Sequence, residues 1–415
     1  MRLVPGLTSA RASRGVPAWA LLVALGVGAA GSVGASAAAS ARDDVSLDRT
    51  RFHEALDLVL DRHVDAADEP ARLRDSLDAV LSSLDPYSYV LAPARAPEPG
   101  ASTPGADGAF GTGLAVAWRQ LNADEVTLEV ASVLPGSPAA RAGLSPGDRV
   151  SAVNGRRAAS FRHQGQLDAA LQSASPLTLT LRDVRGAARA VALQRARLPS
   201  GSLVQSDVVE VGGQRVLWVT IRAFVSGSHR RVEEALQRAR EEVREGAADW
   251  DVLALDLRGN PGGEIEEAVG VADLLLDDGV VTRLRGRGGR VLRELRSHGD
   301  PVVPRRPVLV VQDRYTASAA ELLSAALKER GRARVVGARS FGKGSVQEIV
   351  GLDDGTRMRL TVAHYYSPQD RAIHGRGVEP HQKLRTDGVD VAALASAALA
   401  SGDRRHPASR PSAPR

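Results

Sequence analysis

The sequence of 415 residues has no cysteine, three lysines against 51 arginines, and only 3% aromatic residues. The absence of cysteine excludes disulfides, thiol nucleophiles and lipid attachment at a cysteine, so the fold must rely on its hydrophobic core. The formal net charge of +5 raises the question of nucleic-acid binding. Because the arginines are scattered among acids and the few aromatics cannot provide stacking platforms, we expect no nucleic-acid partner.

The chain also lacks the residue patterns of metal and histidine chemistry. No group of histidines and acids has the spacing of metal ligands, and none of the nine histidines lies in a motif that suggests a Ser-His-Asp triad. We therefore expect no cofactor.

The N-terminus has the composition of an export signal. Three arginines precede an apolar run over residues 16–34, and small residues follow it in the string ASAAASA. This order predicts a signal peptide over residues 1–41, cleaved after Ala37, Ala39 or Ala41, and a periplasmic or extracellular protein. The alternative is an uncleaved membrane anchor, since the run is close to the shortest length that spans a bilayer.

Two amphipathic helices are predicted in the next segment, residues 42–95. Apolar residues recur at helical spacing from Ser46 to Leu84, and the turn Asp85-Pro86 ends the pattern. A flexible linker rich in proline, alanine and glycine over residues 96–109 separates this N-terminal helical segment from the rest of the chain.

Two folded domains are expected after the linker. Short strands with one small helix dominate residues 110–195, whereas strands alternate with helices over residues 196–386. The alternation favours an α/β domain with a mixed sheet, so the expected fold class is a multidomain α+β / α/β protein. A last helix over 387–401 and a disordered tail over 402–415 complete the prediction. Helices are expected at about 164–172, 228–245, 264–276, 319–329 and 389–400.

The small β domain carries two strings that suggest peptide binding, FGTGL and VLPGSPAARAGLSPGDRVSAVNGR. Backbone N–H groups in a glycine-permitted loop can bind a chain-terminal carboxylate, while the neighbouring strand edge pairs with the peptide. The longer string resembles the PDZ domain. By that resemblance Gly111, Thr112, Gly113 and Leu114 form the carboxylate-binding loop; the alternative is that these glycines only make a turn.

A glycine-rich turn follows the apolar run VLALDL. Leu253, Leu255 and Leu257 would face one side of a buried strand, and RGNPGG comes at its end. Sheets of α/β domains place their sites just outside the carboxyl ends of strands, and adjacent glycines let backbone N–H groups approach a ligand. Gly262 and Gly263 are therefore candidate binding residues, with a tight turn of no further role as the alternative.

Ser318 lies where the predicted strand VLVVQD runs through a turn into a helix. The string Ser318-Ala-Ala-Glu321 is a capping-box pattern, so the serine has a purely structural interpretation as a helix cap. The same geometry suits catalysis, because free N–H groups at a helix N-terminus, including that of Ala319, can stabilise an oxyanion. The serine motif by itself leaves both interpretations open.

Lys343 lies in GARSFGKGS, which differs from a phosphate-binding loop because Gly344 stands where a metal-binding hydroxyl is required. A lysine in an apolar site has a lowered pKa, since burial disfavours the ammonium, and can then take a proton from a serine. We expect burial, rather than a positive neighbour, to keep Lys343 neutral. In an extended segment Lys343, Ser345 and Gln347 share a face, so Gln347 can hold the amine in place. A solvated loop lysine is the alternative.

Four strings in order make the sequence similar to the C-terminal processing peptidases, also called tail-specific proteases: LDLRGNPGG, TASAAE, SFGKGSVQ and TVAHYYSPQDRAIHGRGVEP. The resemblance covers about residues 52–391 and implies a serine-type endopeptidase. It implies Ser318 as the nucleophile, Lys343 as the general base and Gln347 as the residue that orients the base.

The resemblance also implies an oxyanion hole made by the backbone N–H groups of Ala319 and of Gly262 or Gly263, with Gly263 preferred. The chain departs from the family pattern at Ala320, where a second serine is usual. It departs again at His374 and His381, where glutamine and aspartate are usual. The two histidines put the choice of substrate in doubt rather than the chemistry.

The implied partners are protein or peptide substrates with free C-termini, an adaptor protein, and further copies of the chain joined through the N-terminal helical segment. Two rival functions are a catalytically inactive PDZ scaffold and a nucleotide-binding protein. Intact Ser318, Lys343 and Gln347 argue against the first. Gly344 and the export signal argue against the second.

Overall fold

The computed structural model describes residues 49–62, 69–91, 110–122, 125–173, 175–183, 186–199, 201, 203–303, 306–353, 355–386, 389 and 391–400. The predicted signal peptide, the linker over 96–109 and the tail over 402–415 lie outside these residues. Helix α1 (Arg49–Arg62) belongs to one unit, and everything from residue 68 onward belongs to a second. None of the helices described is both long and apolar enough to cross a bilayer.

The predicted PDZ-type domain is a small sheet with its own core. Its strand order is β3-β4-β5-β7-β8, with β6 added to β5, so β3 lies at the edge. Ser137 caps the short helix α3 by accepting the N–H of Ala140, and Pro138 occupies the first helical turn, where its missing N–H costs nothing. The elements are β3 (Leu114–Asn122), β4 (Glu125–Val133), α3 (Pro138–Arg141), β5 (Arg149–Val153), β6 (Arg156–Arg157), a 3₁₀ turn (Ala158–Ser160), α4 (Gln164–Ser173), β7 (Leu177–Arg182) and β8 (Ala188–Leu193).

The larger domain is built on a mixed sheet of order β10-β11-β12-β15-β16-β19, in which only β10 is antiparallel to its neighbour. Its strands are β10 (Val204–Val211), β11 (Gln214–Ile221), β12 (Val252–Asp256), β15 (Val308–Gln312), β16 (Arg334–Gly337) and β19 (Gln382–Lys383). Its helices are α5 (Ser228–Arg244), α6 (Ile265–Asp273), α7 (Ala319–Glu329) and α8 (Val391–Ala400).

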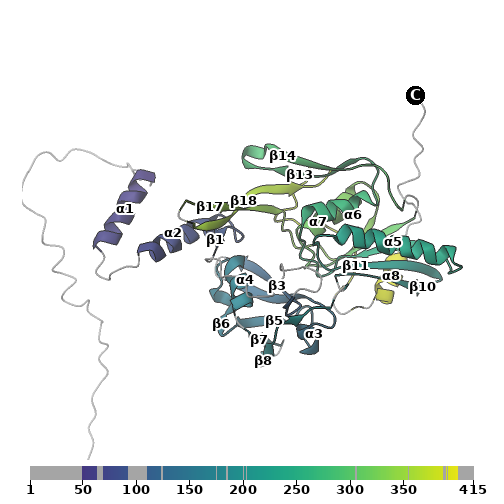
Figure 1. Ribbon diagram of the computed structural model, residues 1–415, viewed down its shortest axis with the longest axis horizontal. Helices are drawn as coiled ribbons and strands as arrows, with labels where there is room; N and C mark the ends of the chain where they lie inside the picture. The colour runs from purple at the N-terminus through teal and green to yellow at the C-terminus, as the bar shows by residue number, and fades with distance from the viewer. Residues whose placement is uncertain are drawn as a thin grey trace, which may run out of the picture. The chain divides into compact units, whose positions relative to one another are not determined.

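Alternate residues of this sheet pack on opposite faces. Leu253, Leu255 and Leu257 join the core under α5, α6 and α7, whereas Val252 and Ala254 join the core under α8 (Figure 1). Because β12 is covered on both faces, its five residues are all buried, as the uninterrupted apolar run predicts. Because β12 and β15 are parallel neighbours, their carboxyl ends lie side by side at the same end of the sheet.

A second sheet has the order β1-β18-β13-β14, with β17 paired to β18. Two of its strands, β17 and β18, come after the lysine motif. Its first strand comes from the turn after α2, far away in sequence, and pairs Tyr89 with Arg359. Its elements are α2 (Glu69–Leu84), which precedes it, β1 (Tyr89–Val90), β13 (Gly279–Arg285), a 3₁₀ turn (Arg287–Gly289), β14 (Val291–Ser297), β17 (Ser345–Gly351) and β18 (Arg357–Tyr366). A short antiparallel pair, β2 (Phe110–Gly111) with β9 (Ala196–Arg197), joins the beginning and the end of the PDZ-type domain.

The predicted fold class is confirmed: N-terminal helices, a PDZ-type β domain and an α/β core with a mixed sheet are all present. Helix α7 begins and ends at the predicted residues. The second sheet was not predicted, because its strands pair across the whole length of the chain.

Candidate active site

The turn between β15 and α7 holds Ser318 in an unusual backbone conformation. Its φ of 55° and ψ of −121° lie outside the regions that a residue with a Cβ ordinarily adopts. Such a conformation costs on the order of 1–3 kcal/mol and persists only where its surroundings enforce it. Asp313 provides part of that restraint, because its buried carboxylate accepts the backbone N–H groups of Tyr315 and Thr316, both at 2.9 Å. The turn thus presents a half-buried serine at the start of a helix.

The glycine-rich turn after β12 lies against Ser318. At Gly262 an added Cβ would come within 2.6 Å of the Ser318 Cβ and 2.9 Å of the Ala319 nitrogen, so a side chain does not fit there. Gly262 donates its own N–H to the side chain of Asn260 at 2.8 Å. The structure therefore brings Gly262 beside the predicted nucleophile and the first N–H of α7, and Gly263 follows it, packed against the backbone of Phe224.

Lys343 lies in the loop between β16 and β17. Its Nζ is 4.9 Å from the centroid of the Tyr87 ring, a cation–π distance. Burial lowers the pKa of Lys343 and the positive charge of Arg359 lowers it further, while Asp168 and Glu321 act in the opposite direction. Burial is the first cause, as expected, but Arg359 is a positive neighbour that the lysine motif did not reveal.

The side chains predicted to form the dyad have different partners in this structure. Among the residues described, no hydrogen bond joins Lys343 Nζ to the Ser318 hydroxyl. The Ser318 hydroxyl interacts with the phenol of Tyr365, whose pKa is raised to about 12, chiefly by burial. Gln347 donates its amide to the hydroxyls of Ser345, at 2.8 Å, and Thr361, at 3.3 Å. The backbone segments of the serine and the lysine meet, whereas their reactive atoms are not paired.

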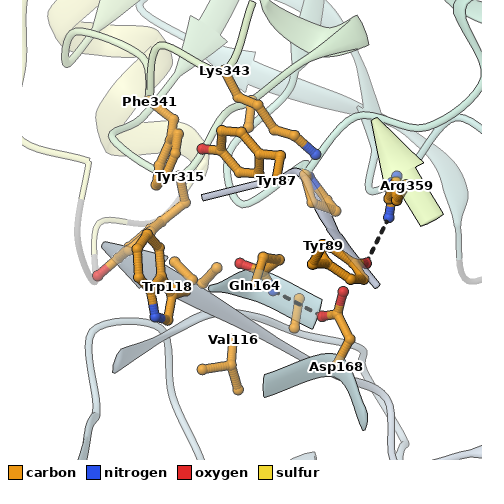
Figure 2. A pocket seen from close by; sticks show the side chains of 15 residues that line it. Tyr87, Tyr89, Val116, Trp118, Gln164, Asp168, Tyr315, Phe341, Lys343 and Arg359 are labelled. Carbon is orange, nitrogen blue, oxygen red and sulfur yellow. Dashed lines mark hydrogen bonds between the residues drawn. The ribbon is translucent and has the colours of Figure 1, made fainter. Parts of the chain in front are cut away.

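The side chain of Lys343 lines an open pocket of about 220 Å³ (Figure 2). Because β3 is an edge strand, a peptide that adds to it would run along the pocket wall. Ala317 and Pro261 border Ser318 and Gly262 in sequence, so the pocket adjoins the candidate nucleophile. It is lined by residues 115–118 of β3, Gln164 and Asp168 of α4, Ala131, Pro261, Tyr315, Ala317, Phe341, Lys343, Arg359, Tyr87 and Tyr89.

The predicted carboxylate-binding loop comes directly before this wall. The carbonyl oxygens of Thr112 and Gly113 accept the N–H groups of Ala139 and Leu134, at 3.0 and 2.8 Å, so the loop is tied to the PDZ-type domain. Gly113 has a φ of 70°, and an added Cβ there would come within 2.2 Å of Ser137. Leu114 is the first residue of β3, whose next four residues line the pocket.

The chain matches two family models, peptidase family S41 over residues 215–384 and the PDZ domain over residues 129–183. The carboxyl-terminal-processing protease of Picosynechococcus sp. is 30% identical over 341 residues, which are 79% of this chain and 77% of that relative. This chain belongs to the carboxyl-terminal-processing proteases of family S41. It is therefore a serine-type endopeptidase with a PDZ domain.

One further relative and one solved structure are similar to this chain. The carboxy-terminal processing protease CtpB of Bacillus subtilis is 27% identical over 367 residues, 84% of this chain and 70% of CtpB. The fold matches that of a photosystem II D1 C-terminal processing protease with a TM-score of 0.66 at 24% identity, over 85% of this chain and 97% of that one.

Sequence reasoning missed the residues by which the PDZ domain of this carboxyl-terminal-processing protease contacts its catalytic core. Arg119 of β3 donates to the carbonyl of Arg314 at 3.1 Å, and the hydroxyl of Tyr315 donates to Glu129 of β4 at 3.0 Å. An added Cβ at Gly259 would meet Ser132 of β4 at 2.8 Å. The turns that precede Ser318 and Gly262 thus rest on the PDZ domain. No local motif marks these residues.

Proposed function

We propose that this protease cleaves peptide bonds with Ser318 as the nucleophile and Lys343 as its general base. The observation that carries the proposal is the strained backbone of Ser318 at the N-terminus of α7, with a Gly262 that tolerates no side chain packed against it. A lysine whose pKa is lowered by burial comes from the adjoining loop. Together they supply a nucleophile, a base and backbone donors for an oxyanion.

The reaction begins when the Lys343 side chain turns from Tyr87 toward Ser318. The neutral amine takes the hydroxyl proton while Ser318 Oγ attacks the carbonyl carbon of the scissile bond. The N–H groups of Ala319 and Gly263 donate to the oxyanion, since the N–H of Gly262 is engaged with Asn260. The ammonium of Lys343 then protonates the leaving amine, which leaves an acyl-enzyme for water to hydrolyse.

In the same proposal Gln347 orients the base after this rotation. Its amide now bonds Ser345 and Thr361, on the strand that leaves the lysine loop and on its partner strand, so it lies close to the path of the amine. An amide positions the amine without adding a charge that would raise the pKa of Lys343.

The PDZ domain, for which we propose residues 110–195, recognises substrates through their C-termini. The edge position of β3 and the glycine loop Gly111–Leu114 before it support this role, because they offer strand pairing and backbone donors to a chain end. The peptidase core would span residues 196–386, with the C-terminal helix over 387–401. The pocket then connects the recognition strand to the catalytic residues.

The cellular location of the protease and its contacts with other chains are part of the same proposal. Its N-terminus would export it to the periplasm or the cell exterior, anchored there if the signal is not cleaved. Exposed apolar residues on each N-terminal helix, Phe52 and Val59 on α1 and Val80 and Leu84 on α2, are candidates for contact with another copy of the chain or with an adaptor.

One experiment separates this function from the inactive PDZ scaffold. Wild type and Ser318→Ala are incubated with casein and with a C-terminally tagged protein, and the products are analysed by mass spectrometry. Cleavage by wild type alone supports the proposal, because the alanine variant lacks the nucleophile. No products from either protein would favour the scaffold, whereas equal products from both would mean that Ser318 is not the nucleophile. The alanine variant should also retain bound substrates without cleaving them, so that they can be identified in a pull-down.

A further inference from the structure

Glu321 is a fully buried carboxylate in the first turn of α7, three residues after Ser318. One of its oxygens accepts two backbone N–H groups, that of Ser318 at 2.9 Å and that of Lys343 at 2.8 Å. The other accepts the hydroxyl of Ser340 at 2.6 Å and the N–H of Gly342 at 2.7 Å. Four donors therefore converge on a single side chain.

A helix cap explains only one of these four hydrogen bonds. The bond to the Ser318 N–H is the half of the capping box that the sequence predicted. The other three donors come from the loop that contains Lys343, about twenty residues further along the chain. A buried carboxylate needs such donors, because burial without them disfavours its charged form.

We propose that Glu321 is a positioning residue that joins the backbone of the nucleophile to the backbone of the base through one carboxylate oxygen. Both N–H groups share that oxygen, so the main chains of Ser318 and Lys343 are held at a fixed separation. The Lys343 side chain can then swing between Tyr87 and Ser318 while its own Cα stays in place. The inference rests on the Ser–Lys mechanism proposed above.

The charge of Glu321 has a second effect on the base. Burial raises the pKa of Glu321 itself, while its four donors lower it. In its charged form Glu321 favours the ammonium, so it raises the pKa of Lys343 against the effects of burial and of Arg359. Removing the charge would let Lys343 lose its proton at a lower pH.

Two substitutions separate the bridge from the charge. In Glu321→Gln an amide NH₂ replaces one oxygen and accepts no hydrogen bond, so one of the two donor pairs loses its acceptor and we expect kcat to fall about 100-fold with KM little changed. The rise of kcat with pH should also move to lower pH. Glu321→Asp keeps the charge but is too short to reach both segments, so kcat should fall while the rise stays near that of wild type.

Glu267→Gln is the matched control. Glu267 is a buried carboxylate of α6 that accepts the backbone N–H groups of Gly227 and His229, one on each oxygen. Its variant should lose thermal stability without moving the pH profile. If Glu321→Gln folds and keeps the wild-type kcat, or loses activity with an unmoved pH profile in the manner of the control, the proposal is wrong.

Hydrogen exchange tests the bridge independently of activity. The amides of Gly342 and Lys343 and that of Ser318 should all exchange faster in Glu321→Ala, because this substitution removes both acceptor oxygens. Faster exchange at the start of α7 alone would reduce Glu321 to a cap and overturn the bridge. If Ser318→Ala proves as active as wild type, the Ser–Lys mechanism fails first, and exchange still decides whether the two segments are joined.

Discussion

The nucleophile and the base of this protease are held in different ways. The Ser318 turn is restrained by neighbours in its own strand–turn–helix unit, Asp313 and Glu321, and by the adjacent β12 turn. The Lys343 side-chain nitrogen instead lies among Tyr87, Asp168 and Arg359, which come from the N-terminal segment, the PDZ domain and β18. Most of the restraint on the nucleophile thus comes from within the peptidase core, whereas the pKa of the base depends on segments spread over the whole chain.

The largest effect is expected from Lys343→Arg, which keeps the length and charge of the side chain. A guanidinium stays protonated at any working pH and cannot take the serine proton, so proteolysis should be abolished. The measurement is cleavage of a tagged peptide across the pH range. Lys383→Arg, at an exposed lysine, is the control and should retain activity. Activity in Lys343→Arg would rule out lysine as the base.

Gly262→Ala tests how the turn after β12 holds the nucleophile in place. The new Cβ would clash with Ser318 and with the Ala319 nitrogen, so we expect a loss of about 100-fold in kcat through displacement of the nucleophile. Gly213→Ala is the control: it has a similarly positive φ of 78° but nothing within 4 Å of the added Cβ. Equal activity in the two variants would mean that the β12 turn does not set the serine geometry.

A smaller effect should come from amidation of a substrate's C-terminus. If the loop before β3 binds the terminal carboxylate, amidation removes a charge-assisted contact of about 1.5–3 kcal/mol, so cleavage at low substrate concentration should slow about ten-fold or more. Initial rates for the acid and amide forms of one peptide measure it. Equal rates would show that the PDZ domain does not recognise chain ends.

The smallest effects concern the charges around the base, where only the pH profile changes. Arg359→Met removes a positive charge that lowers the pKa of Lys343, so the rise of activity should move to higher pH. Asp168→Asn removes a negative charge that raises this pKa, so the rise should move to lower pH. Arg357→Met, at an exposed position two residues earlier on β18, is the control. Shifts in the same direction for both variants would contradict these opposite roles of Arg359 and Asp168.

The pair Ser318 and Lys343 illustrates what could be predicted from the sequence. A strand, a turn and a capping-box helix are short-range patterns, and they predicted the bounds of α7 and the place of Ser318 at its start. The loop with Lys343 was likewise recognisable from its glycines. Arg359 was not, because nothing in the string RMRLTVAHYY distinguishes it from the other arginines before β18 pairs it with β1.

Short-range patterns in the sequence were enough to predict the helices and the central strands of the larger domain, because hydrophobic period, glycines and caps act over a few residues. They were also enough to indicate the family, because the catalytic strings are specific in their order. Two features depended on the tertiary fold: Glu321, predicted as a cap, also holds the lysine loop, and Arg359 and Asp168 act on Lys343 with opposite sign. The physical reason is that hydrogen bonding across loops and the pKa of a buried amine depend on distances in space, which only the packing of remote segments sets.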